Sequence, residues 1–140
     1  MYKCALLLLQ ILIVFLFTSC REEILAPGNF AGNVNEPIQD NRTNYYGIII
    51  NAKNLTSNIS AYTNFSYHTT KTLLTITDLE TGSITFTIRD KQGVSLYRFS
   101  AGSEVTNDFR KITSAIPGKV DISFNNFSGK MKFSLSYHID

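Results

Sequence analysis

From residue 45 to the end of the chain, apolar and polar side chains alternate with a period of two. The clearest example is residues 83–89, in which Ile84, Phe86 and Ile88 alternate with Ser, Thr and Arg. Successive side chains of a β-strand point to opposite faces of a sheet, so this alternation predicts a strand with one buried face. No segment shows a sustained period of 3.6 residues, and helices are therefore expected to be minor.

Turn-forming residues separate the alternating segments at intervals of about 8 to 12 residues. Asp90-Lys91-Gln92-Gly93 suits a four-residue hairpin loop with its glycine in the left-handed region. Glu80-Thr81-Gly82 and residues 125–129 are also predicted to be turns. Residues 101–118 are predicted to form a longer connection with one helical turn near residues 107–111. Strands are predicted over residues 46–52, 59–67, 74–77, 83–89, 94–100, 120–124 and 131–137.

About seven strands with this spacing predict an all-β fold, a single antiparallel β-sandwich of the jelly-roll or immunoglobulin-like kind. Three segments, Gly82–Phe86, Asp90–Gly93 and Pro117–Phe124, resemble parts of small jelly-roll or GOLD-like sandwich domains. Those domains share a glycine-led strand, an Asp-x-x-Gly hairpin and a late Pro-Gly followed by an alternating strand. The resemblance implies the same architecture and says nothing of a ligand.

Residues 1–19 have the three parts of a secretory signal peptide. Lys3 supplies the positive start, residues 5–17 form a short apolar core, and Thr18 and Ser19 precede the cleavage site. A membrane-spanning helix needs about 20 apolar residues to cross roughly 30 Å of hydrocarbon, so this core is short for a permanent anchor. A cleaved signal is therefore predicted, and an uncleaved membrane segment is the alternative.

Phe17-Thr18-Ser19-Cys20 resembles the lipobox of bacterial lipoproteins, with Phe17 in a place where that family usually has an aliphatic residue. In this family the cysteine sulfur receives a diacylglycerol and the signal is cut just before it. The resemblance implies that Cys20 is lipidated and anchors the chain in the bacterial cell envelope. In this family an Asp directly after the cysteine implies retention in the inner membrane. The residue here is Arg21, which implies release to the outer membrane. Arg21-Glu22-Glu23 is also similar to the export signal of Bacteroidetes-type surface lipoproteins, so the domain is expected to face the periplasm or the cell surface.

Residues 20–44 have a different composition from the rest of the chain. Their turn-forming Pro, Gly and Asn residues show no apolar period, which predicts a flexible tether that begins with the lipidated cysteine. The sandwich domain is then predicted at residues 45–140. The alternative is that apolar residues of this segment pack along an edge of the sheet, namely Ile24, Leu25 and Phe30.

The cysteines and the charge balance exclude several functional classes. Cys4 leaves with the signal and Cys20 carries the lipid, so no thiol remains for a disulfide, a metal site or a nucleophile. The 13 Lys and Arg nearly balance the 11 Asp and Glu, so no basic excess predicts a nucleic-acid partner. His68 and His138 are expected at the surface, because neither has a second ligand at metal-binding spacing. No nucleotide-binding, hydrolase or metalloprotease motif is found, and no cofactor or metal is predicted.

Carboxylate chemistry leaves little trace in a sequence, so two alternatives remain open. A calcium site would take oxygens from loop carboxylates, and its candidates are Asp78, Glu80, Asp90 and Asp108. A small hydrolase would bring together two carboxylates across the fold, with Asp78 or Asp121 paired with Glu80 or Glu104. Acids in turns commonly bond to the local backbone, and no enzyme activity is predicted.

Five aromatic residues are candidates for exposed, ligand-binding rings: Tyr45, Tyr46, Tyr62, Tyr97 and Phe127. Two or three rings on one face would stack on the apolar C–H faces of sugars, and the alternative is that they pack within the sheet. The sequence thus predicts a cell-envelope lipoprotein whose non-enzymatic sandwich acts by binding or by structural interaction. Its partner would be a polysaccharide or an envelope protein, which in the structural role would extend an uncovered edge strand.

Overall fold

The structure is a computed structural model that describes residues 33–138. The predicted signal peptide, the predicted lipidation at Cys20 and the rest of the predicted tether as far as residue 32 lie outside the described residues. Within the described part, no helix is long and apolar enough to cross a membrane.

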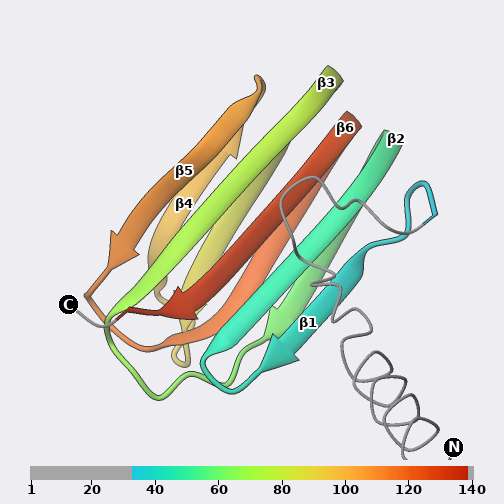
Figure 1. Ribbon diagram of the computed structural model, residues 1–140. Helices are drawn as coiled ribbons and strands as arrows, with labels where there is room; N and C mark the ends of the chain where they lie inside the picture. Colours follow the sequence, from blue (N-terminus) through green and yellow to red (C-terminus); the bar gives the residue numbers. More distant parts are fainter. Residues whose placement is uncertain (1–32, 139–140) are drawn as a thin grey trace, which may run out of the picture.

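The described residues form six β-strands in one antiparallel sheet (Figure 1). The strands are β1 (Ile38–Arg42), β2 (Tyr45–Tyr62), β3 (Thr70–Asp90), β4 (Ser95–Ala101), β5 (Val105–Ile112) and β6 (Pro117–Tyr137). Their order is β1-β2-β6-β3-β4, and β5 pairs with β3 as well. The last strand of the chain, β6, therefore lies between β2 and β3.

Strands β2, β3 and β6 have 18, 21 and 21 residues, and each of them bends in the middle. The register shifts between Ala52 and Leu55 in β2, and again between Thr77 and Ser83 in β3. At the bends the backbone has positive φ, for example 82° at Gly82 and 48° at Asn126. Such residues kink and twist a strand without ending it. The sheet therefore folds over on itself (Figure 1).

The folded sheet makes two layers that enclose one core. The front layer holds β1, β5 and the segments 45–52, 70–77 and 130–137, and the back layer holds β4 and the segments 57–62, 83–90 and 117–124. Phe86 of the back layer and Phe133 of the front layer stack with their ring centroids 4.8 Å apart. The predicted all-β antiparallel fold is confirmed, and its two layers are made by one continuous sheet.

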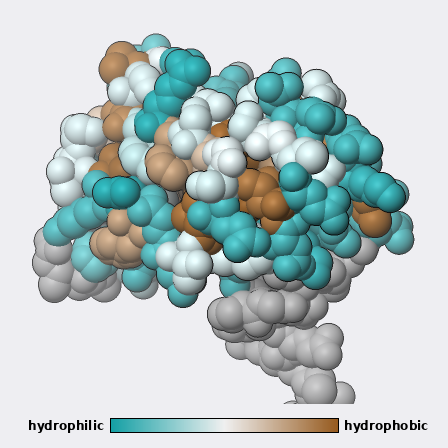
Figure 2. Space-filling model, turned by 90° about the horizontal axis from the view of Figure 1, so that it is seen from above, coloured by the Kyte–Doolittle hydropathy of each residue, from teal (hydrophilic) through white to brown (hydrophobic). Residues whose placement is uncertain are grey.

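The core consists of the inward-facing residues of both layers. Fully buried side chains include Ile48, Ile50, Ile76, Met131, Phe133 and Leu135 in front, and Ile84, Phe86, Ile88, Val120, Ile122 and Phe124 behind. Burying a side chain of this size stabilises a fold by about 1.5–3 kcal/mol. Seen from above, by contrast, the outer surface is largely hydrophilic with small hydrophobic areas (Figure 2).

Two segments that were predicted to be turns do not reverse the chain. Residues 80–82 and 125–129 are bends inside β3 and β6, and β2 likewise runs through a third bend. Each long strand therefore replaces two predicted strands, and two strands that were not predicted, β1 and β5, bring the total in the described residues to six instead of about seven. The glycines and asparagines supply the left-handed conformations that a turn needs, but a continuous partner strand keeps the chain from reversing.

Other predicted boundaries also change. Residues 105–112 form β5 in place of a helical turn, because they pair with the exposed edge of β3. The sheet begins at Ile38, within the predicted tether, because β1 pairs with β2. The predicted strand 59–67 ends at Tyr62.

The hairpin at residues 90–93 is confirmed. Gly93 has a φ of 87°, and its N–H donates to the carbonyl of Asp90 at 3.2 Å. The Asp90 carboxylate accepts from the N–H groups of Gln92 and Val94 at 2.9 and 2.8 Å.

Candidate ligand-binding face

The outward surface of the back layer is a polar face, which we call the back face. Since Ile84, Phe86 and Ile88 point inward, their neighbours along β3 point outward. The same alternation applies to β2, β6 and β4 in the back layer. The outward residues are Asn58, Ser60 and Tyr62 of β2, Lys119, Asp121 and Ser123 of β6, Thr85, Thr87 and Arg89 of β3, and Arg98 and Ser100 of β4.

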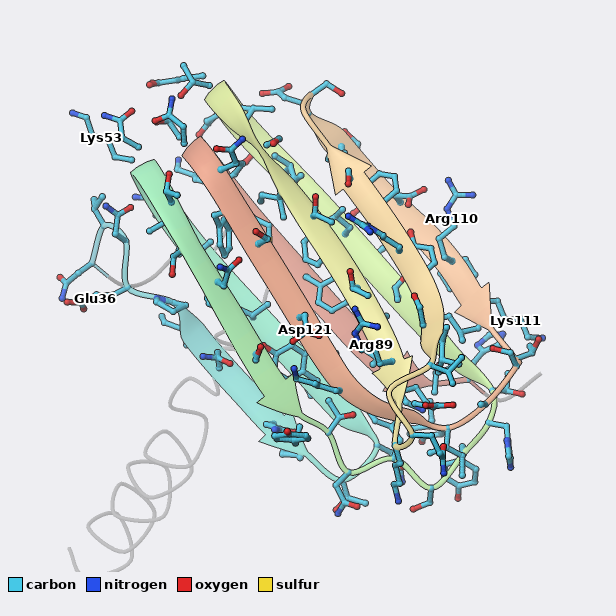
Figure 3. All side chains as sticks on the ribbon, turned by 180° about the vertical axis from the view of Figure 1, so that it is seen from behind. Glu36, Lys53, Arg89, Arg110, Lys111 and Asp121 are labelled. Carbon is cyan, nitrogen blue, oxygen red and sulfur yellow. The ribbon has the colours of Figure 1, made fainter. Side chains whose placement is uncertain are left out.

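Asp121 is at the centre of this face, and three strands hold its carboxylate (Figure 3). Ser60 Oγ donates to Oδ1 at 2.6 Å, and Lys119 Nζ lies 2.8 Å from the same oxygen. Arg89 Nε approaches Oδ2 at 3.4 Å. Partial burial acts to raise the pKa of Asp121, but the hydrogen bonds from Lys119, Ser60 and Arg89 and the charge of Lys119 hold that pKa below its usual value. Asp121 is therefore a fixed, ionised acceptor.

Arg89 is fixed at both ends of its guanidinium, because its Nη1 donates to the carbonyl of Gly93 at 3.1 Å. Arg98 lies one strand away, and no residue among 33–138 forms an ion pair with it. On the described part of the back face, positive charges on Arg89, Arg98 and Lys119 exceed the single negative charge on Asp121. The face is therefore a net positive surface around one acceptor.

Tyr62 projects at one end of the back face with 80% of its surface exposed. Lys119 Nζ lies 5.9 Å from the centroid of its ring, which is within the range of a cation–π contact. Two open hollows lie on this face, and Tyr62 lines one of them. One, of about 430 Å³, is lined by Ser60, Arg98, Asp121 and their neighbours, and the other, of about 330 Å³, is lined by Tyr62, Lys119 and the 90–93 hairpin. Arg89 lines both hollows.

The five predicted aromatic residues do not form one surface. Tyr46 and Phe127 are fully buried, so the prediction that they are exposed is wrong. Tyr46 has the inward direction of Ile48 and Ile50, and burial raises its pKa to about 12. Its hydroxyl donates to Gln39 Oε1 at 3.0 Å. Phe127 fills the bend of β6 and lies 5.8 Å from Phe124, centroid to centroid.

Tyr45 and Tyr97 are half-buried and line neither hollow. The guanidinium of Arg42 lies 5.0 Å from the centroid of the Tyr45 ring. Tyr97 stacks on Phe99 at 6.5 Å, and burial and the charge of Asp108 raise its pKa. Among the predicted candidates, Tyr62 is thus the one that lines the back face. Ser60, Arg89 and Lys119 are not predicted from the sequence, although their outward positions in alternating strands would have marked them as surface residues.

Two of the acids considered for the calcium site are paired with cations in the described residues. Asp78 pairs with Lys130 at 2.8 Å, and Asp108 pairs with Arg110 at 3.0 Å. Within residues 33–138, no group of three His, Cys, Asp or Glu side chains is arranged to hold a metal ion. His68 is exposed, and His138 meets the ring of Phe109 edge-on at 6.0 Å.

Neutralising Asp121 tests the electrostatics of this face. A lowered folded-state pKa stabilises the fold above the unfolded value of about 3.9, and this stabilisation is lost as the pH falls through the lower folded value. Asp121→Asn is therefore expected to reduce stability at pH 7 by roughly 0.5 kcal/mol and to flatten the decline of stability between neutral pH and pH 2. Urea unfolding of both proteins across this pH range measures the effect. Parallel curves for the variant and the wild type would contradict it.

No protein-family model matches the sequence, and no curated protein matches it. Among solved structures, a chain from Bacillus endospore appendages, described as a novel family of disulfide-linked pili, is similar in fold with a TM-score of 0.43. It has 16% sequence identity, and the match covers 83% of this chain and 98% of that chain. A similarity of this size carries no inference about function.

Proposed function

We propose that this chain is a lipid-anchored protein of the bacterial cell envelope that acts by binding, and that its back face binds a glycan. The observation that carries the proposal is the exposed ring of Tyr62 next to the ordered group of Lys119, Asp121 and Ser60. The lipobox that ends at Cys20 supports the anchored location.

The chemistry of the back face matches that of a sugar. The C–H face of a sugar ring is apolar and packs on an aromatic ring, whereas its hydroxyls both donate and accept hydrogen bonds. Tyr62 offers the ring, Asp121 offers an acceptor, and Arg89 offers donors. Because existing contacts hold Asp121 and Arg89 in place, little side-chain entropy is lost when a ligand binds.

Binding suits these groups better than catalysis. Hydrolysis of a glycoside needs one carboxyl group that donates a proton and a second that acts as a base or nucleophile. The pKa of Asp121 is lowered, which suits an acceptor. The nearest hairpin acid, Asp90, is already bonded to two backbone N–H groups.

The test is retention of the protein on gels that carry bacterial polysaccharides. Tyr62→Ala is expected to weaken retention on the preferred polysaccharide by roughly two- to tenfold, because a ring contact contributes about 0.5–1.5 kcal/mol. Tyr67→Ala is the matched control, since Tyr67 is also exposed but packs 5.5 Å from Tyr137 and lines neither hollow. Equal retention of the Tyr62 variant and the wild type, or no retention of the wild type on any gel, would overturn the proposal.

A further inference from the structure

The outer edges of the folded sheet differ in how they are protected from pairing with another strand. Natural edge strands usually carry charges or proline, which discourage such pairing. β1 has Asp40 and Arg42, β4 has Arg98, and β5 has three charged residues. Residues 55–61 of β2, Leu-Thr-Ser-Asn-Ile-Ser-Ala, have neither a charge nor a proline.

Asparagine side chains occupy the edge of β2 at both ends of this segment. β1 pairs with β2 only as far as Ile49. Beyond it, Asn35 takes the place of a neighbouring strand: its Oδ1 accepts from Lys53 N–H at 2.8 Å, and its Nδ2 donates to the Lys53 carbonyl at 3.0 Å. At the far end, Asn41 Nδ2 donates to the carbonyl of Tyr62 at 2.8 Å. Among residues 33–138, no backbone pairing covers this side of residues 55–61.

The open segment has the backbone direction that a further strand needs. The bond from Asn41 shows that the carbonyl of Tyr62 points away from β6. In an antiparallel strand every second residue points its N–H and C=O to the same side, so Thr56, Asn58 and Ser60 also point them outward. Leu55, Ile59 and Ala61 alternate with these residues and are only half-buried at the margin of the core. An added strand would pair with the outward N–H and C=O groups, and it would help to cover the half-buried apolar side chains.

We propose that residues 55–61 of β2 pair antiparallel with the same segment of a second copy of this chain. A two-fold axis at Asn58 places Thr56 opposite Ser60 on the outward side, and on the inward side it places Leu55 opposite Ala61 and Ser57 opposite Ile59. Because the segment is neutral, its self-pairing brings no like charges together. The edge strands β1, β4 and β5 carry charged residues and would do so. The two back layers then join into one continuous sheet, independently of any glycan on the back face.

Cross-linking of the full-length chain in membranes tests the proposed axis. Asn58→Cys places two thiols on adjacent strands, where the Cα atoms of a hydrogen-bonded pair are about 5.5 Å apart and within disulfide range. Oxidation is expected to give a covalent dimer of this variant. Thr106→Cys, an equally exposed position on the edge strand β5, is the control that should remain monomeric.

A second variant keeps the test independent of disulfide geometry. Asn58→Lys brings two ammonium groups together at the axis, and it is expected to weaken dimerisation of the detergent-solubilised protein at least about tenfold. Asn58 is exposed, so the fold should remain, and circular dichroism checks this. The proposal is overturned if Asn58→Cys gives no dimer, if it cross-links to a different protein, or if Asn58→Lys leaves the molecular mass of a dimer unchanged.

Discussion

Gly82→Ala is expected to destabilise the fold by about 4 kcal/mol, because it forces a side chain into the bend of β3. Gly82 has a φ of 82°, a backbone conformation that residues with a side chain rarely adopt. An added Cβ would also collide with the backbone carbonyl oxygens of Asn125 and Asn126 in β6. Backbone atoms inside a paired strand cannot rotate away as a side chain can. Urea unfolding monitored by circular dichroism measures the loss.

Gly93→Ala is the matched control for this variant. Gly93 has a similar φ of 87°, but an added Cβ there meets no atom within 4 Å. The expected loss of stability comes from the positive φ alone and is about 1 kcal/mol. The difference between the two variants therefore measures how closely β3 and β6 approach at the bend. Equal losses would contradict the close approach of the two strands.

Cys20→Ala is expected to move nearly all of the protein from the membrane fraction to the soluble fraction. Each buried CH₂ of an acyl chain contributes about 0.8 kcal/mol, so a doubly or triply acylated cysteine holds a protein to a membrane almost permanently, and its removal leaves nothing comparable. Fractionation by centrifugation, followed by intact-mass measurement of the wild type, gives both the location and the acyl mass. The soluble variant should unfold in urea as the wild type does.

Cys4→Ala is the control for the loss of a thiol. Cys4 precedes the predicted cleavage site, so this variant is expected to remain in the membrane fraction with the mass of the acylated wild type. A Cys20 variant that still sediments with membranes and retains the mass of residues 1–19 would contradict lipidation. That result would support an uncleaved membrane segment.

Alternation along the strands was sufficient to predict much of the fold. It places Ile84, Phe86 and Ile88 in the core, and the Asp90–Gly93 hairpin follows from local turn chemistry. The bends were not predictable in the same way. Gly82 has the same local conformation in a turn and in a bent strand, and the difference depends on whether β6 continues alongside it. That information lies about 45 residues away in the chain.

The candidate site shows the same division between local and distant information. Tyr62 was among the predicted aromatics, whereas Tyr46, also predicted to be exposed, lies on the core side of β2 in the structure. The group around Asp121 could not be predicted, because Ser60, Arg89 and Asp121 come from three strands. They meet only through the strand order β2-β6-β3, which no local pattern encodes.

The central position of β6 also determines when this protein can fold. Because β6 separates β2 from β3, those two strands lack their main partner until residues 117–137 are present. The pairings of β2 and β3 with β6, which are the longest in the sheet, therefore have to wait for these residues, whereas β1–β2, β3–β4 and β3–β5 can pair earlier. Pairings between distant residues also form slowly. A nascent chain would therefore remain incompletely paired until residues 117–137 have left the ribosome. On the proposed export route, β2 and β3 would therefore lack their main partner until residues 117–137 have also crossed the membrane.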